Sequence, residues 1–194
     1  MAISTDMVKE LRDATGVAIM QCKKALEEAG GDIEKAKIIL RKQSAAIASK
    51  KKDRELGAGI VAAYTHAGGS VVGTVVLLCE TDFVAKSDEF KKLAYDVAMH
   101  VAAMNPRFLT REDVKDEDLK AAREVFEKEA AVVPEVARKK AVEGKLNAYI
   151  SEKVILDQPF VKDPSVTVRT LLDSAVQKFG ERVELARFER LSVK

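Results

Sequence analysis

Near its middle the chain reads Ile60-Val61-Ala62-Ala63-Tyr64-Thr65-His66, then Ala67-Gly68-Gly69-Ser70, then Val71-Val72-Gly73-Thr74-Val75-Val76-Leu77-Leu78-Cys79. Two runs rich in β-branched residues on either side of a Gly-Gly turn predict a β-hairpin. The second run is apolar at nearly every position, so we expect both of its faces to be covered.

Segments that would pack on this hairpin follow it. An apolar helical repeat runs from Phe90 to Val101, and Asn105-Pro106 ends it. A second helix is expected over residues 168–179, between Thr167 as N-cap and Gly180. The tail, residues 182–192, alternates apolar and polar residues with one slip, which predicts a strand with a bulge. These elements predict an α+β fold built on a small antiparallel β-sheet.

The N-terminal part is helical in pattern from Ile3 to about Lys42. Glycines divide it into three short helices, and the second carries an apolar stripe made of Ile19, Cys22, Ala25, Leu26 and Ala29. Residues 43–54, rich in Ala, Ser and Lys, predict a linker. We therefore divide the chain into a compact three-helix module with its basic linker, residues 1–53, and an α+β core, residues 54–194.

Within the core, residues 117–143 are dense in charge and have only a thin apolar stripe. Pro134 stands where a second helix would begin. This pattern predicts a charged helical hairpin over about residues 114–148 that lies largely in solvent. A sheet of about three strands is near the lower limit of independent stability. An open face or edge would favour pairing with a second copy of the chain.

Composition excludes several classes of protein. The 194 residues carry 33 Lys and Arg against 31 Asp and Glu, a net charge of +2, without the basic excess typical of nucleic-acid binding. No apolar run approaches the roughly 20 residues that span a bilayer, and the first residues do not resemble a signal peptide. We expect a cytoplasmic protein that binds no membrane and binds no nucleic acid directly.

Residues for covalent chemistry are also lacking in the sequence. His66 and His100 have no Cys, Ser or carboxylate at a catalytic or metal-binding spacing. Cys22 and Cys79 lie far apart without a zinc-type partner, and no P-loop motif occurs. We expect no enzyme, no metal and no cofactor, with His66 at the surface and His100 in helix packing.

Three features remain open on the pattern alone. The basic run at 50–54 is typical of a solvated linker, and RNA binding is the less favoured alternative because no aromatic residue is interleaved. Met20 leaves the apolar stripe of its helix, which suits either a protein contact or chance exposure. Phe83, placed on a loop between the strand and a helix starting at Ser87-Asp88, is either a buried anchor or a wedge inserted into a partner.

The same places carry a family resemblance. The segment Leu11-Arg12-Asp13-Ala14-Thr15-Gly16, continuing to Cys22-Lys23-Lys24-Ala25-Leu26-Glu27, resembles the N-terminal signature of bacterial translation elongation factor Ts. Glu80-Thr81-Asp82-Phe83-Val84-Ala85-Lys86 resembles the second signature of that family. Further similar segments extend the likeness over essentially the whole chain, which has one hairpin-plus-helix unit like the short family members.

This resemblance implies a guanine nucleotide exchange factor for elongation factor Tu, acting in protein biosynthesis without covalent chemistry. It implies that the N-terminal module has a ubiquitin-associated-type (UBA-like) fold and that the short form is a homodimer. The partner-binding residues that it implies are Arg12, Ile19, Met20, Thr81, Asp82, Phe83, Val84 and, as a weaker candidate, His100. The competing hypothesis is an RNA- or ribosome-binding accessory protein that uses the basic run.

Overall fold

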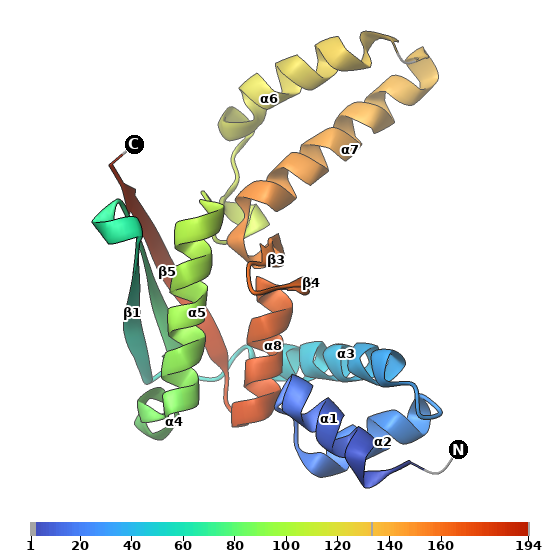
Figure 1. The fold of residues 1–194 in the computed structure, drawn as a ribbon. Coiled ribbons are helices and arrows are strands. Elements are labelled where there is room, and N and C mark those ends of the chain that lie inside the picture. Colours follow the sequence, from blue (N-terminus) through green and yellow to red (C-terminus); the bar gives the residue numbers. More distant parts are fainter. Residues whose placement is uncertain (1–2, 133, 194) are drawn as a thin grey trace.

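The computed structural model describes residues 3–132 and 134–193 and has an α+β fold, as the sequence predicts (Figure 1). The helices are α1 (Thr5–Thr15), α2 (Ile19–Glu28), α3 (Ile33–Lys51), α4 (Asp82–Lys86), α5 (Asp88–Met104), α6 (Asp116–Glu129), α7 (Glu135–Lys153) and α8 (Val168–Phe179). The strands are β1 (Ala58–His66), β2 (Val71–Cys79), β3 (Pro159–Phe160), β4 (Asp163–Thr167) and β5 (Val183–Ser192).

The main sheet is antiparallel, in the order β1-β2-β5. The predicted hairpin of β1 and β2 is confirmed, with Val61 opposite Val76. The predicted bulge in the tail strand is also confirmed, because Val76 pairs with Arg187 whereas the next residue, Leu77, pairs with Leu185. Strands β3 and β4 form a separate short ribbon that leads into α8.

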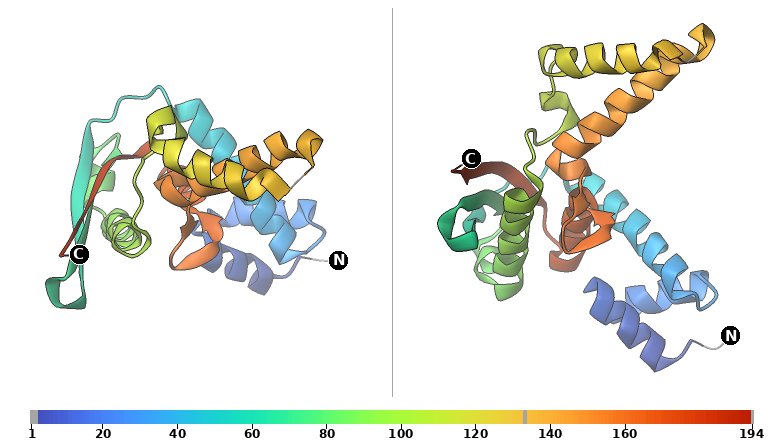
Figure 2. Two further views of the ribbon diagram at one scale, coloured as in Figure 1. Left: turned by 90° about the horizontal axis from the view of Figure 1, so that it is seen from above. Right: turned by 45° about the horizontal axis from the view of Figure 1, so that its top comes forward.

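Helices α5 and α8 cover one face of the sheet (Figure 2). The approach of α5 to β2 is so close that a Cβ atom on Gly73 would lie 2.2 Å from the Ala98 carbonyl oxygen. Gly73 is therefore required for this packing, since a backbone oxygen cannot move away as a flexible side chain can. The core between the layers includes Val75, Leu77, Phe90, Val97, Val101, Val168, Val176 and Leu185.

The opposite face of the sheet is open within the described chain. Val61 is 70% exposed and Leu191 is 64% exposed on this face, and Figure 2 shows no helix across it. The expectation that both faces of β2 are covered is therefore wrong for the isolated chain. An antiparallel sheet can leave one face in water.

The N-terminal module is a three-helix unit with its own apolar core, which includes Leu11, Cys22, Leu26, Ala36 and Leu40. Its third helix continues to Lys51, so residues 43–51, predicted as a linker, are helical. Ala and Lys are strong helix formers, and this extension packs against α8. The Ser44 hydroxyl donates to the Leu40 carbonyl and also bonds with the Gln177 side chain. A continuous helix, rather than a flexible linker, thus joins the module to the core.

Helices α6 and α7 form the predicted charged hairpin, which extends away from the rest of the molecule at the top of Figure 1. A small separate cluster of Leu119, Ala130, Val142 and Leu146 holds the two helices together. Helix α7 runs to Lys153, a few residues beyond the predicted end. In the part of the chain that the structure describes, no helix has the length and apolarity to cross a membrane.

Candidate partner-binding site

The segment after β2 forms a short helix, α4, where a loop was predicted. Thr81 is its N-cap and accepts a hydrogen bond from the Val84 backbone N–H. Val84 is buried in the core, whereas Phe83 on the same turn is 83% exposed. The buried-anchor reading of Phe83 is therefore wrong, because Val84 serves as the anchor. A large aromatic ring is held in water by a helix that is fixed to the core beneath it.

Asp82 gives the exposed turn a negative charge beside the aromatic ring. Its carboxylate is solvent-exposed and accepts a hydrogen bond from Lys86 Nζ at 2.5 Å. This lysine bond is the main cause that lowers the pKa of Asp82 below its ordinary value. Asp82 is therefore ionised at neutral pH, and its position in the first turn of α4 is favourable for a negative charge.

The second group of exposed residues lies on the N-terminal module. Met20 is 63% exposed, in agreement with its predicted outward position, and Arg12 is also exposed. Ile19 is 54% exposed although it belongs to the predicted core stripe. It is the first residue of α2, so no preceding helical turn covers it. Arg12, Ile19 and Met20 thus leave one charged and two apolar side chains available at the α1–α2 junction.

The α1–α2 junction and α4 lie at the same end of the molecule, opposite the α6–α7 hairpin (Figure 1). Lys178, near the end of α8, contacts both the α1–α2 junction and the start of α5, the helix that follows α4. Its Nζ lies 2.7 Å from a Glu89 carboxylate oxygen in the first turn of α5. Its side chain also runs alongside Gly16, where an added Cβ would lie 3.2 Å from Lys178 Cδ. No local sequence signal marks Lys178, since the residues that it contacts, Gly16 and Glu89, lie far from it in the sequence.

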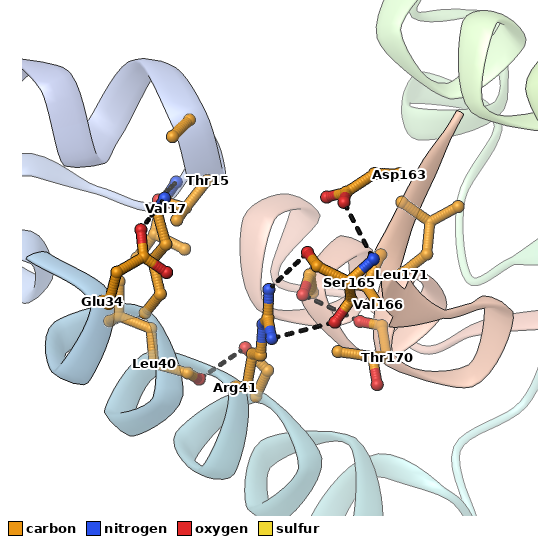
Figure 3. A pocket seen from close by; sticks show the side chains of 14 residues that line it. Thr15, Val17, Glu34, Leu40, Arg41, Asp163, Ser165, Val166, Thr170 and Leu171 are labelled. Carbon is orange, nitrogen blue, oxygen red and sulfur yellow. Dashed lines mark hydrogen bonds and ion pairs between the residues drawn. The ribbon is translucent and has the colours of Figure 1, made fainter. Parts of the chain in front are cut away.

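A second contact fixes the module against the core. The Arg41 guanidinium donates to the carbonyl oxygen of Ser165 at 3.1 Å and to its Oγ at 3.2 Å (Figure 3). These bonds cross a cavity of about 230 Å³ between α3 and the β4–α8 segment. The Gln177 amide also donates to the Gln21 side chain at 2.8 Å. Polar contacts from α2 and α3 of the module thus set its orientation on α8 and β4.

His100 does not belong to either exposed group. Its side chain is fully buried, and its Nε2 lies 2.8 Å from Gln158 Oε1. The predicted packing role is confirmed, whereas His100 and the buried Val84 do not offer their side chains to a partner in this structure. Burial lowers the pKa of His100 below its ordinary value, so the ring is neutral at neutral pH. His66, by contrast, is exposed as predicted.

The basic run at the end of α3 is partly occupied within the chain. Lys51 Nζ donates to the Gly180 carbonyl at 2.7 Å, and Arg54 pairs with Glu80 at 3.2 Å. These contacts make Lys51 and Arg54 less available to phosphate groups. Among the described residues no group of His, Cys, Asp and Glu could hold a metal ion. The exposed candidates for partner binding therefore lie on α4 and at the α1–α2 junction.

The family model described as Elongation factor TS matches residues 37–194. The chain belongs to this family. It is similar to "Elongation factor Ts" of Herpetosiphon aurantiacus, with 45% identity that covers 100% of this chain and 98% of the relative. The protein of the same name from Carboxydothermus hydrogenoformans is 46% identical over 98% of this chain and 89% of the relative. That from Thermotoga neapolitana is 44% identical over 100% and 98%.

Membership of the elongation factor Ts family places the chain in translation elongation and implies nucleotide exchange on elongation factor Tu. The resemblance stated on sequence motifs is thereby confirmed. In the structure, the residues of the second signature have two different environments. Phe83 and Asp82 are exposed, whereas Val84 is buried and anchors the helix.

Proposed function

We propose that this chain releases GDP from elongation factor Tu by docking through Arg12, Ile19 and Met20 and inserting Phe83 beside Asp82. The insertion point is the magnesium and phosphate site of the partner. The observation that carries the proposal is the 83% exposure of Phe83 on a helix whose neighbouring residue, Val84, is buried. A large aromatic side chain that is exposed to water has an unfavourable free energy of hydration, and burial of the ring in a contact with another protein removes it.

The physical basis of such exchange is thermodynamic linkage. A factor that prefers the nucleotide-free partner weakens GDP binding by the same factor by which GDP weakens its own binding. Phosphate and magnesium are held in GTPases mainly by backbone amides, a lysine and coordinating side chains. An apolar ring that displaces these loops has no polar group, so it cannot replace the contacts that the phosphates lose. Each 1.4 kcal/mol or so of preference for the empty state lowers nucleotide affinity about tenfold.

The test is nucleotide release from elongation factor Tu loaded with a fluorescent GDP, followed in excess unlabelled GDP at increasing concentrations of the chain. We expect saturable acceleration by the wild type. In Phe83→Ala the maximal release rate should fall about 30-fold, since a buried aromatic anchor contributes about 2 kcal/mol or more. Met20→Ala should instead raise the concentration that gives half-maximal release. A wild-type chain without acceleration, or Phe83→Ala with a normal maximal rate, would contradict the proposal.

Two matched variants control for the loss of exposed apolar surface. Val132, on the α6–α7 hairpin, is 90% exposed, and Met104, at the far end of α5, is 41% exposed. Val132→Ala and Met104→Ala should leave both the maximal rate and the half-saturating concentration unchanged. If the wild type is inactive, the salt dependence of RNA binding tests the accessory-protein alternative, because phosphate contacts make affinity fall steeply with salt.

The open face of the sheet supports a further part of the proposal. Val61 and Leu191 lie on it among the half-buried side chains of Val76 and Leu78. We assign a second copy of the chain to this face, because two identical apolar faces related by a two-fold axis are self-complementary. The proposed homodimer acts in the cytoplasm, where translation elongation takes place, and its UBA-like modules dock on the partner.

A further inference from the structure

The turn between α8 and β5 lies directly against the segment that precedes α4. Gly180 ends α8 with a φ of 72°, a left-handed conformation that glycine adopts without strain, and turns the chain. The next residue, Glu181, is half-buried and its carboxylate is directed at the backbone before α4.

Glu181 binds the N-cap of α4 through three hydrogen bonds. Oε2 accepts from the backbone N–H groups of Glu80 at 3.1 Å and Thr81 at 3.0 Å. Oε1 accepts from the Thr81 hydroxyl at 2.6 Å. Hydrogen bonds to a charged acceptor are about twice as strong as neutral ones. A single carboxylate thus fixes both the backbone and the side chain of the residue from which α4 begins.

The contact is reciprocal and reaches the N-terminal module. The Glu80 carboxylate accepts from the Arg182 backbone N–H at 2.5 Å, and this bond is the main cause that lowers the pKa of Glu80. The Arg182 guanidinium donates to the Arg54 carbonyl at 2.6 Å. Lys51, in the last turn of α3, donates to the turn itself at Gly180. The turn therefore ties the start of α4 to the end of the helix that comes from the docking module.

We propose that Glu181 is a positioning residue that holds α4 so that Phe83 and Asp82 are presented in one fixed orientation; this inference rests on the proposed function. The exposed ring of Phe83 has few contacts of its own, so its direction is set by the backbone of α4. If the orientation of Phe83 is already fixed before binding, its insertion costs less conformational entropy. A larger part of the free energy of its contacts with the partner is then available to weaken GDP binding. Glu181 therefore acts on exchange without touching the partner.

The first experiment compares Glu181→Ala and Glu181→Gln with wild type in the nucleotide-release assay. Glu181→Ala removes all three bonds, and we expect a maximal release rate about tenfold lower with a half-saturating concentration within twofold of wild type. Glu181→Gln keeps the shape but loses the charge and one acceptor, so its loss should be smaller; it remains informative if the alanine variant does not fold. Glu129→Ala, which removes an ion-paired carboxylate on the hairpin, is the control and should have no effect.

A double variant separates positioning from general destabilisation. If Glu181 acts only through the wedge, Glu181→Ala combined with Phe83→Ala should be no slower than Phe83→Ala alone. Independent, multiplicative losses would overturn the inference. So would a maximal rate within twofold of wild type for Glu181→Ala, or a loss confined to the half-saturating concentration.

A readout without the partner tests the bonds themselves. We expect the backbone amides of Glu80 and Thr81 to exchange hydrogen at least tenfold faster in Glu181→Ala than in wild type, with the core amides of β2 unchanged. Unchanged exchange at these two amides would overturn the inference even if the variant is slow. If the amides respond but wild type does not accelerate GDP release, the proposed function fails while the structural role of Glu181 stands.

Discussion

Replacement of His100 by leucine tests the buried polar network at the end of the core. The Val161 backbone N–H donates to His100 Nδ1 at 3.2 Å, so the ring proton is on Nε2, which donates to Gln158 Oε1 at 2.8 Å. The Gln158 amide in turn donates to the Glu152 carbonyl at 2.7 Å, which fixes its orientation. His100 thus joins α5 to the segment between α7 and α8.

His100→Leu leaves two partners unsatisfied, the side-chain oxygen of Gln158, a residue 1% exposed, and the backbone N–H of Val161. A buried polar group without a partner costs about 1–3 kcal/mol. Because leucine fills a similar volume, little is added for a cavity. The expected loss is about 2–4 kcal/mol, which corresponds to a decrease of about 5–15 °C in the melting temperature of a chain of this size.

The same residue makes stability depend on pH in a defined direction. Burial lowers the pKa of His100 in the native state, whereas the unfolded chain titrates near the ordinary value of 6.5. Below that pH the unfolded state binds more protons than the native state, so stability falls as the pH falls. Between pH 7.5 and 5.5 this single group contributes at most about 1.4 kcal/mol to the decrease.

The assay is urea unfolding of wild type, His100→Leu and His66→Leu at both pH values. His66 is exposed, and its ring lies beside Tyr64, whose hydroxyl is 3.1 Å from His66 Nδ1, so its replacement should leave the stability nearly unchanged. His100→Leu should be less stable at pH 7.5 and should lose less stability on acidification. Wild-type stability in His100→Leu, or the same pH dependence, would refute the role assigned to the network.

Three further predictions concern stability and assembly. Gly73→Ala should lower the free energy of unfolding by at least about 2 kcal/mol in urea, because its Cβ would overlap backbone atoms of α5. Gly144→Ala, in α7, should instead stabilise by about 0.5–1 kcal/mol, because beyond the adjacent backbone of its own helix the added Cβ would meet no atom within 4 Å. Asp173→Asn should raise the melting temperature at pH 7, since burial raises the pKa of this carboxyl and disfavours its charge, and the gain should vanish near pH 4. Val61→Asp should convert a dimer to a monomer in sedimentation velocity; a wild-type monomer, or a dimeric Val61→Asp, would contradict the assignment of the open face.

The parts of the fold that could be predicted from sequence are those with strong local signals. The hairpin turn, the N-cap Ser87 and the boundaries of α8 at Thr167 and Gly180 all follow from turn and capping residues within a few positions. The slip in the tail pattern predicted a bulge in β5, and the register shift between Val76 and Leu77 confirms it, because alternation with a period of two cannot continue across an extra residue. The positions of these elements are determined by residues within a few positions in the sequence, and contacts with distant segments do not change them.

The wrong or missing predictions have two physical causes, which are contacts between segments far apart in the chain and elements too short to show a period. The extension of α3 through residues 43–51 depends on α8, which begins more than a hundred residues later in the chain. Helix α4 contains five residues, too few for a periodic pattern. Strand β3 has two residues and is likewise too short to show an alternating pattern in the sequence. The candidate site was located by its motifs, but its support by Glu181 depends on contacts between segments 100 positions apart.

The contrast between the exposed side chains from Thr81 to Phe83 and the buried side chain of Val84 explains why the hydrogen bonds from Glu181 matter for the proposed nucleotide exchange. A ring that must displace partner loops needs to stay exposed before binding, and an exposed ring cannot be oriented by packing. Its direction must therefore come from the backbone, which Val84 anchors from below and Glu181 fixes at the N-cap. Because Lys51 binds the same turn from the end of α3, the proposed docking of the N-terminal module would also define where the proposed wedge meets the partner.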